Sequence, residues 1–259
     1  MEKTEKISVI KQQSFFVAKS NEIIQKSRFS MTVQQQKLML FLISKIKPDD
    51  EPGLHYTITI RDYCAVCNID GDSGKNYADI RASLKGIADK SMWLTRWDGK
   101  EVLLRWLDRI ELDAKGGTIT VRFHEDMFPH LLNLRSRYTQ YSLEYILPMR
   151  SKYGIRMYEL MRSYANMESV ITLPIEELKK RMDCDKYKRF PDFRRYALEP
   201  ALEDINSYTD INVKINLRKK NGSRSYTDIE FYIHPLEVSE SIWRRLHRNA
   251  VLVGHKEKY

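Results

Sequence analysis

The sequence is poor in cysteine, with Cys64, Cys67 and Cys184 as its three thiols among 259 residues. An odd number this small does not suit the disulfide frameworks of secreted domains. Long apolar runs are also missing, since Leu38–Ile43 falls far short of the roughly 20 residues that cross a bilayer. The first twenty residues are interrupted by lysines and lack the apolar core of a signal peptide. These absences predict a cytoplasmic protein, neither secreted nor membrane-spanning.

Motifs for nucleotide hydrolysis and DNA nicking are missing as well. The pairs Gly74-Lys75 and Gly99-Lys100 lack both the upstream Gly and the following Ser or Thr of a phosphate-binding loop. No two of the six histidines stand two residues apart, so the paired-His metal site of rolling-circle nicking enzymes is absent. The single C-x-x-C pair would need a second pair to bind zinc, and two core cysteines are the favoured interpretation. We expect no enzyme activity, no metal and no cofactor.

Positive charge is what the sequence has in excess. Lys and Arg number 44 against 35 Asp and Glu, a formal net charge of +9. This balance suits a polyanionic partner, although it also serves solubility or binding to an anionic membrane. With 42% hydrophobic residues, the chain is long enough for one large domain or two small ones.

The first half of the chain has an order of elements typical of a winged helix. The capping-box pair Thr32 and Gln35 opens a helix that runs to residue 46. A strand at 56–60, a helix at 61–67 and a longer helix ending near residue 89 follow. From residue 92 the apolar period changes to two, with hairpin turns at Asp98-Gly99 and at 115–117.

The second half repeats this order, with a helical region predicted at 143–164 in two pieces divided near Pro148, and further helices at 175–182 and 191–206. Strands are predicted at 170–173, 211–217 and 226–233, and Asn221-Gly222 between the last two is a strong hairpin signal. The same apolar spacing recurs in both longer helices, at Ile80, Leu84 and Ile87 and at Leu198, Leu202 and Ile205. We therefore predict an α+β fold with two tandem winged-helix domains, at 31–136 and 137–238. An N-terminal arm at 1–30 and a basic C-terminal tail at 239–259 flank them.

A winged helix places its second helix in the major groove of DNA and its wing on phosphates. The second domain has basic residues at both places, namely Lys186, Lys188, Arg189, Arg194 and Arg195 near the start of the longer helix and Arg218, Lys219, Lys220 and Arg224 at the wing. The first domain is less basic, with Lys75, Asn76, Tyr77, Arg81 and Lys85 on its helix and Arg96 and Lys100 at its first hairpin. Runs of charge can also form an ordinary solvated face. We expect the first domain to add less affinity or to serve in dimerisation.

Three segments resemble the replication initiator proteins of theta-replicating plasmids that carry iterons, the direct repeats of an origin. They are Asn21–Ile24, Thr32–Leu38 and, above all, the region from Tyr141 to Leu160. The specific part is Ser-Lys-Tyr-x-Ile-Arg-x-Tyr-Glu-Leu, which begins at Ser151. The resemblance extends from about Asn21 to Pro235, nearly the whole chain.

The resemblance implies a monomer that binds origin repeats in double-stranded DNA with both domains, a dimer that represses its own gene, and recruitment of host replication proteins. By position, 186–195 would be the main reader of bases, 218–224 its wing and 75–85 a weaker reader. Lys152 and Arg156 would contact phosphate or simply lie on the helix surface. The alternatives are a plain winged-helix transcriptional regulator and an origin-nicking nuclease that forms a tyrosine adduct.

Overall fold

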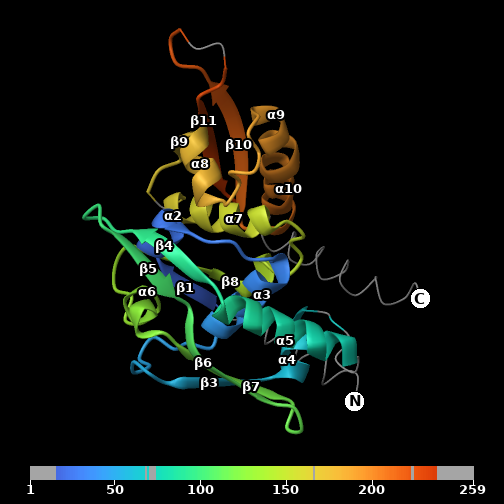
Figure 1. Ribbon diagram of the computed structural model, residues 1–259. Coiled ribbons are helices and arrows are strands. Elements are labelled where there is room, and N and C mark those ends of the chain that lie inside the picture. Colours follow the sequence, from blue (N-terminus) through green and yellow to red (C-terminus); the bar gives the residue numbers. More distant parts are fainter. Residues whose placement is uncertain (1–15, 68, 70–73, 166, 223–224, 238–259) are drawn as a thin grey trace. The chain divides into compact units, whose positions relative to one another are not determined.

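The computed structural model describes residues 16–67, 69, 74–165, 167–222 and 225–237 (Figure 1). The chain divides into two units, each with its own core. Unit 1 comprises Met1–Ser27 and Met31–Leu147, and unit 2 comprises Arg28–Ser30 and Pro148–Tyr259. Within the described residues, no helix is both long and apolar enough to span a membrane. The predicted basic tail at 239–259 lies outside the described residues.

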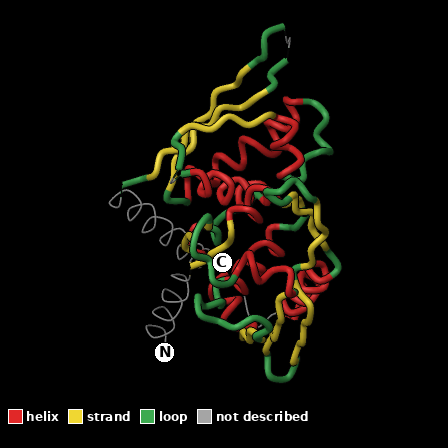
Figure 2. The backbone as a smooth tube through the Cα atoms, turned by 90° about the vertical axis from the view of Figure 1, so that its left-hand side faces the viewer, coloured by secondary structure: helices red, strands yellow, loops and turns green. Residues whose placement is uncertain are grey.

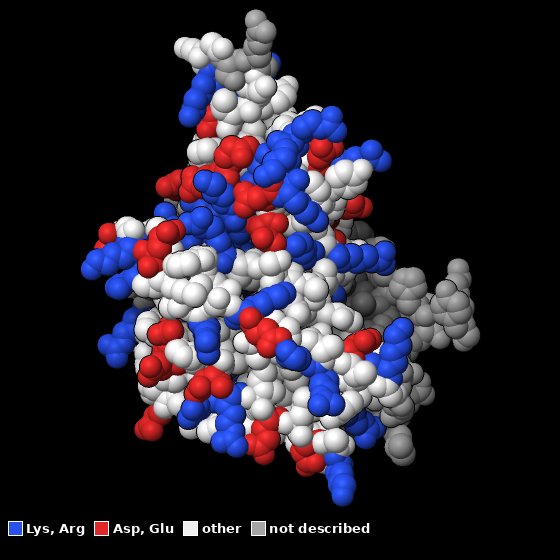
Figure 3. Space-filling view, in the orientation of Figure 1, with Lys and Arg blue, Asp and Glu red and all other residues white. Residues whose placement is uncertain are grey.

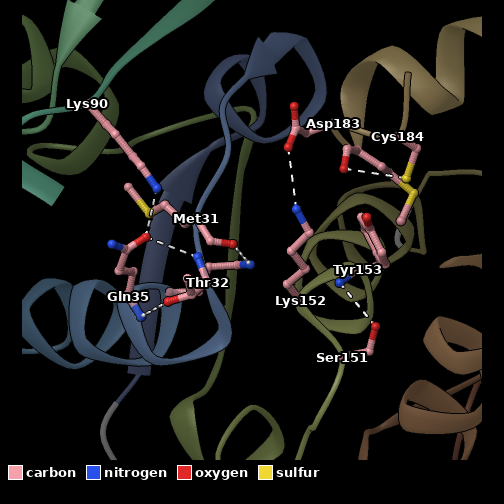
Figure 4. Close-up of polar contacts among 11 residues, drawn as sticks. Met31, Thr32, Gln35, Lys90, Ser151, Lys152, Tyr153, Asp183 and Cys184 are labelled. Carbon is pink, nitrogen blue, oxygen red and sulfur yellow. Dashed lines mark hydrogen bonds and ion pairs between the residues drawn. The ribbon is translucent and has the colours of Figure 1, made fainter. Parts of the chain in front are cut away.

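The winged-helix part of unit 1 combines helices with a sheet of strand order β3-β7-β6 (Figure 1). Its elements are α3 (Val33–Ile43), β3 (His55–Thr59), α4 (Ile60–Cys67), α5 (Gly74–Ala88), β6 (Leu107–Asp113) and β7 (Thr118–Phe123). The capping box that opens α3 is confirmed, because Thr32 and Gln35 each bond the backbone amide of the other (Figure 4). The stripe Ile80, Leu84 and Ile87 of α5 is buried, as its spacing predicts.

Unit 1 has further elements, of which β2 ends at Arg28 in unit 2. They are β1 (Phe16–Ser20), α2 (Asn21–Lys26), β2 (Ser27–Arg28), β4 (Ser91–Thr95), β5 (Glu101–Arg105), η1 (Glu125–Met127), α6 (Phe128–Leu131), β8 (Tyr138–Ser142) and η2 (Leu143–Tyr145). β1 pairs antiparallel with β8, and β4 forms a hairpin with β5. The β1–β8 pairing makes both strands part of unit 1. Residues 16–27 are therefore not a separate arm, and the division falls after Leu147, not at the predicted residue 136.

Unit 2 repeats the order of elements, with a sheet of order β10-β11-β9. Figure 2 shows its strands on one side and its helices on the other. The elements are α7 (Lys152–Tyr164), β9 (Val170–Pro174), α8 (Ile175–Arg181), α9 (Phe190–Phe193), η3 (Arg194–Leu198), α10 (Glu199–Tyr208), β10 (Ile211–Arg218) and β11 (Asp228–Pro235). The two units also share an equivalent backbone hydrogen bond at the start of the first helix of each helix-turn-helix. The Ile60 amide donates to the Gly117 carbonyl at 2.8 Å, and the equivalent Ile175 amide donates to Thr227 at 2.9 Å.

Side chains of α10 and of Ser151 hold the start of α7. Ser151 caps the helix by accepting the Tyr153 amide at 3.2 Å (Figure 4). Asp204 of α10 accepts the amides of Arg150 and Ser151 at 3.1 and 2.8 Å. A Cβ on Gly154 would lie 2.6 Å from that carboxylate, so only glycine permits this approach. The cap at Ser151 fixes the start of α7 at Lys152, so the predicted helical region 143–164 is divided near Pro148 as expected, into the short η2 and α7.

Candidate nucleic-acid interface

The second helix of the helix-turn-helix in unit 2 runs through α9, η3 and α10, and η3 is a single π-turn. The amide of Glu199 donates to the carbonyl of Arg194, five residues back. Pro200 accounts for this turn, because proline has no N–H for the carbonyl four residues back and its ring clashes with that carbonyl in a regular α-helix.

The π-turn changes which residues face the core of unit 2. Phe193, Ala197, Ala201 and Ile205 are all fully buried and recur every fourth residue. A turn with one extra residue keeps such positions aligned, whereas the regular 3.6-residue period would let them drift around the helix. Leu202, predicted to belong to the buried stripe, is therefore only half-buried.

Cations gather at the N-terminal end of this helix, which we call its front. Figure 3 shows Lys and Arg side chains concentrated over α8 and α9, interspersed with acidic ones. Arg194 pairs with Glu199 at 2.7 Å and Arg189 with Asp192 at 3.1 Å. Exposed pairs of this kind are worth only about 0–1 kcal/mol, so phosphate can replace their carboxylates. Within the described part of the chain, the exposed cations Lys186, Lys188 and Arg195 have no ion pair with a carboxylate.

Aromatic rings lie beneath three of the predicted site residues. Lys186 lies 4.9 Å from the ring of Tyr187, Arg195 lies 5.3 Å from Tyr196, and Lys219 lies 5.1 Å from Tyr226. Tyr187 and Tyr196 stack at 5.9 Å, and Phe190 contacts Tyr226 at 5.7 Å. A ring face attracts a cation and limits its movement. Sequence reasoning missed these tyrosines, although each directly neighbours or closely follows a basic residue.

The wing of unit 2 extends beyond β10 and β11 (Figure 1). Lys219 and Lys220 are exposed at its tip, where Gly222 takes a left-handed conformation with φ +81°. That conformation is accessible to glycine without strain, as the Asn-Gly turn predicts. Arg218 is half exposed and pairs with Glu230, whereas Arg224 lies outside the described residues.

Unit 1 places its predicted site residues less compactly. Lys75 and Arg81 are exposed on α5, whereas Asn76 and Tyr77 are half-buried. Lys85, also exposed, pairs with Asp89. Asn76 lies in the wall of a small hollow between α3, α4 and α5.

The wing of unit 1 is β6–β7, because β3-β7-β6 corresponds to β10-β11-β9 read from the other edge. Arg96 and Lys100 lie at the tip of the separate β4–β5 hairpin, and Arg96 is 4.0 Å from Asp98. They are therefore not wing residues. The exposed Lys115 occupies the tip of β6–β7, between Asp113 and Gly117. Sequence reasoning missed Lys115, although superposing the two repeats by strand order would have found it.

The two cations of the family segment have different surroundings. Lys152 is half-buried and its Nζ lies 3.4 Å from the Asp183 carboxylate (Figure 4). Arg156 is only 7% exposed, 3.7 Å from the buried Glu159, and its guanidinium lies 4.2 Å from the Phe29 ring. The expectation that Arg156 lies on the surface or contacts phosphate is therefore wrong. A buried, paired guanidinium belongs to the core of unit 2.

Of the two cysteines interpreted as core residues, Cys64 is buried, whereas Cys67 is partly exposed. Cys184 is also buried, and burial raises the pKa of the Cys67 and Cys184 thiols to about 12. In the described ranges, no group of three or more His, Cys, Asp or Glu side chains is arranged to hold a metal ion.

Each unit thus carries a helix-turn-helix followed by a wing, and the chain is a tandem winged-helix protein, as predicted. Family comparison specifies it further. Residues 16–162 match the family described as "Initiator Replication protein, WH1", and residues 174–233 match "Initiator Rep protein, WH2". The chain belongs to this family of initiator replication proteins.

Individual relatives are more distant. A "Replication initiation protein" of Escherichia coli is 21% identical over 213 residues, 78% of this chain and 65% of the relative. A "PI protein" of Escherichia coli is 26% identical over 158 residues, 54% of this chain and 52% of the relative. The chain therefore spans between half and two thirds of these relatives' length. A crystal structure of the Pi initiator protein in complex with iteron DNA has a TM-score of 0.70 at 21% identity, covering 87% of this chain and 99% of that chain.

Proposed function

We propose that this chain initiates plasmid replication by binding repeated origin sites, iterons, in double-stranded DNA. The observation that carries the proposal is the joint placement of exposed cations at the front of the α9–α10 helix and at the tip of the β10–β11 wing. These are the two places where a winged helix meets the groove and the phosphates. The initiator family of the chain and the iteron complex of the structurally similar Pi initiator support the choice of DNA target.

The two units have unequal roles in this proposal. In unit 2, Arg195 and Arg194 face bases from the helix, with Lys186, Lys188 and Arg189 beside them and Lys219, Lys220, Arg218 and Arg224 on the wing. In unit 1, α5 supplies Lys75, Asn76, Tyr77, Arg81 and Lys85, and we add Lys115 from the wing. Arg96, Lys100 and Lys152 would contact phosphate outside the two helix-wing surfaces.

Unit 1 also carries a surface that supports dimerisation. Trp93 of β4 lies directly opposite Leu103 of β5, and the two side chains are 50% and 53% exposed. An exposed apolar cross-strand pair is typical of an interaction surface. We propose that a second copy covers it when the chain represses its own gene. Host replication proteins would then open and copy the DNA in the cytoplasm, and the initiator itself performs no chemistry.

The first experiment measures affinity for a duplex carrying the direct repeats that flank the gene and for a scrambled duplex of equal length. We expect preference for the repeats and an affinity that falls steeply with salt, because phosphate contacts release counterions. A flat dependence of log affinity on log salt contradicts DNA binding. Incubation with supercoiled origin DNA and magnesium should give no nicked product.

A second measurement separates an initiator from a plain transcriptional regulator. A plasmid whose only origin carries the repeats is introduced into cells with or without the chain supplied in trans. An initiator maintains the plasmid, and loss of Arg195 together with Lys219 abolishes maintenance. A regulator protects an operator near its gene but maintains no plasmid.

A further inference from the structure

Arg218 is held in an unexpected way on the wing of unit 2. In the β10–β11 register it stands directly opposite Asp228. Its guanidinium nevertheless bonds Glu230, two residues further along β11, with Nε at 3.2 Å and Nη2 at 2.8 and 2.9 Å from the carboxylate oxygens. Asp228 instead accepts the Thr227 hydroxyl at 2.6 Å. The diagonal pair thus replaces the pair that the register alone would give.

Glu230 is the centre of a small network on the face of the sheet opposite the buried Ile229 and Phe231. Besides Arg218, its carboxylate accepts the Tyr232 hydroxyl at 2.6 Å and the Asn216 amide at 3.4 Å. The Glu230 side chain is 12% exposed, whereas that of Arg218 is 55% exposed. Hydrogen bonds from Arg218 and Tyr232 lower the pKa of Glu230 to about 2, so the carboxylate stays charged under ordinary conditions.

This arrangement gives Arg218 a different character from Lys219 and Lys220. Its Nε and Nη2 donate to Glu230, so Nη1 of the same planar group is not engaged by this carboxylate. A neutral pair releases few counterions, so it adds little sequence-independent affinity. A fixed donor edge, however, suits bidentate contact with one guanine or one phosphate.

We propose that Glu230 is a positioning residue that directs Arg218 toward one DNA contact and limits its part in non-specific binding. The proposal rests on the proposed DNA-binding function. It assigns the wing two kinds of cation, the directed Arg218 and the tip lysines Lys219 and Lys220. Glu230 therefore contributes to specificity without contacting DNA.

The test is Glu230→Gln, which keeps the shape of the side chain and removes its charge. We expect affinity for a scrambled duplex to rise about threefold or more and the salt slope to steepen by about one unit, because Arg218 becomes an unneutralised cation. The ratio of the affinity for the repeat duplex to that for the scrambled duplex, the preference, should fall by a similar factor. Glu168→Gln, a change at an exposed carboxylate outside the wing, is the charge control and should leave the preference unchanged.

A double-mutant cycle isolates the role of Arg218. In the Arg218→Ala background, Glu230→Gln should have no further effect on preference. If it changes both duplexes equally in either background, Glu230 is only a general charge and the proposal is overturned. Tyr232→Phe provides a milder change that keeps the carboxylate charged, and it should lower the preference by a smaller factor. Failure of the unaltered chain to bind either duplex would instead contradict the proposed function.

Discussion

Arg194 and Glu199 are joined twice, by the backbone bond of the π-turn and by a 2.7 Å ion pair between Nε and Oε1. In a regular α-helix, residues five apart lie on different faces, so the side-chain pair depends on the π-turn. The turn therefore sets how the front of the helix, with Arg194 and Arg195, is rotated relative to α10.

The first prediction concerns Pro200→Ala, which restores an N–H for the Tyr196 carbonyl. We expect stability to be retained or raised by up to about 3 kcal/mol, the usual cost of an interior proline. Preference for the repeat duplex should fall, since the front of the helix rotates. Thermal melts and affinities for both duplexes measure the two effects. Pro191→Ala is the control, because Pro191 lies in the first turn of α9, where proline is tolerated; equal effects at both positions would contradict a role for the π-turn.

The second prediction concerns Gly154→Ala. The added methyl group would lie 2.6 Å from the Asp204 carboxylate, which also holds the amides of Arg150 and Ser151. We expect a loss of about 1–3 kcal/mol in the free energy of unfolding, because both helices must shift. Urea denaturation measures it. Gly74→Ala, where a Cβ would meet open space, should be neutral or slightly stabilising, and a similar loss there would refute the close-approach argument.

The elements that could be predicted from the sequence are those with local signals. The Thr32–Gln35 capping box, the Asn221-Gly222 turn and the buried stripe of α5 all depend on residues within a few positions of one another. Together with the repeated order of elements, they indicate two winged helices. Local signals of this kind are enough to define the fold class.

What the sequence could not predict depends on distant contacts. Pairing of β1 with β8 joins residues more than 110 positions apart, so it leaves no local period. From its position in the helix, Arg156 is predicted to lie on the surface. In the structure it contacts Phe29 and Glu159 and is buried. Similarly, a basic residue signals its charge but not its partner, and only the structure separates Arg218, held by Glu230, from the exposed Lys219.

The third prediction is a pH dependence of stability from His130, which is buried in unit 1. Burial lowers its pKa, and Arg96 lowers it further, although Glu22 and Asp126 oppose this. Its Nδ1 lies 2.8 Å from the Ser20 hydroxyl.

In the unfolded chain, the His130 imidazole takes up a proton near pH 6.5. In the folded chain, the same imidazole remains neutral to a lower pH. Below about pH 6.5 the unfolded state thus binds more protons, and stability should fall until the folded pKa is reached. Urea denaturation of His130→Gln between pH 8 and 5 should show a smaller loss. The exposed His55→Gln is the control; an unchanged pH profile for His130→Gln would exclude this origin.

The fourth prediction separates base reading from phosphate binding in unit 2. Because Arg195 is exposed and has no ion pair among the described residues, it should read a base, and Arg195→Ala should cost about 1–3 kcal/mol and relax preference at one base pair. Arg194 must first leave Glu199, so Arg194→Ala should cost less.

Lys219→Ala and Lys220→Ala at the wing tip should weaken all sequences by similar factors and lower the salt slope by about one unit each. Lys214→Ala, an exposed change on β10 away from the tip, is the control and should do neither. Affinities for the repeat duplex, for single-base variants of it and for a scrambled duplex at several salt concentrations decide the matter. Loss of preference in Lys219→Ala but not in Arg195→Ala would show that the wing reads bases and the helix only holds the backbone.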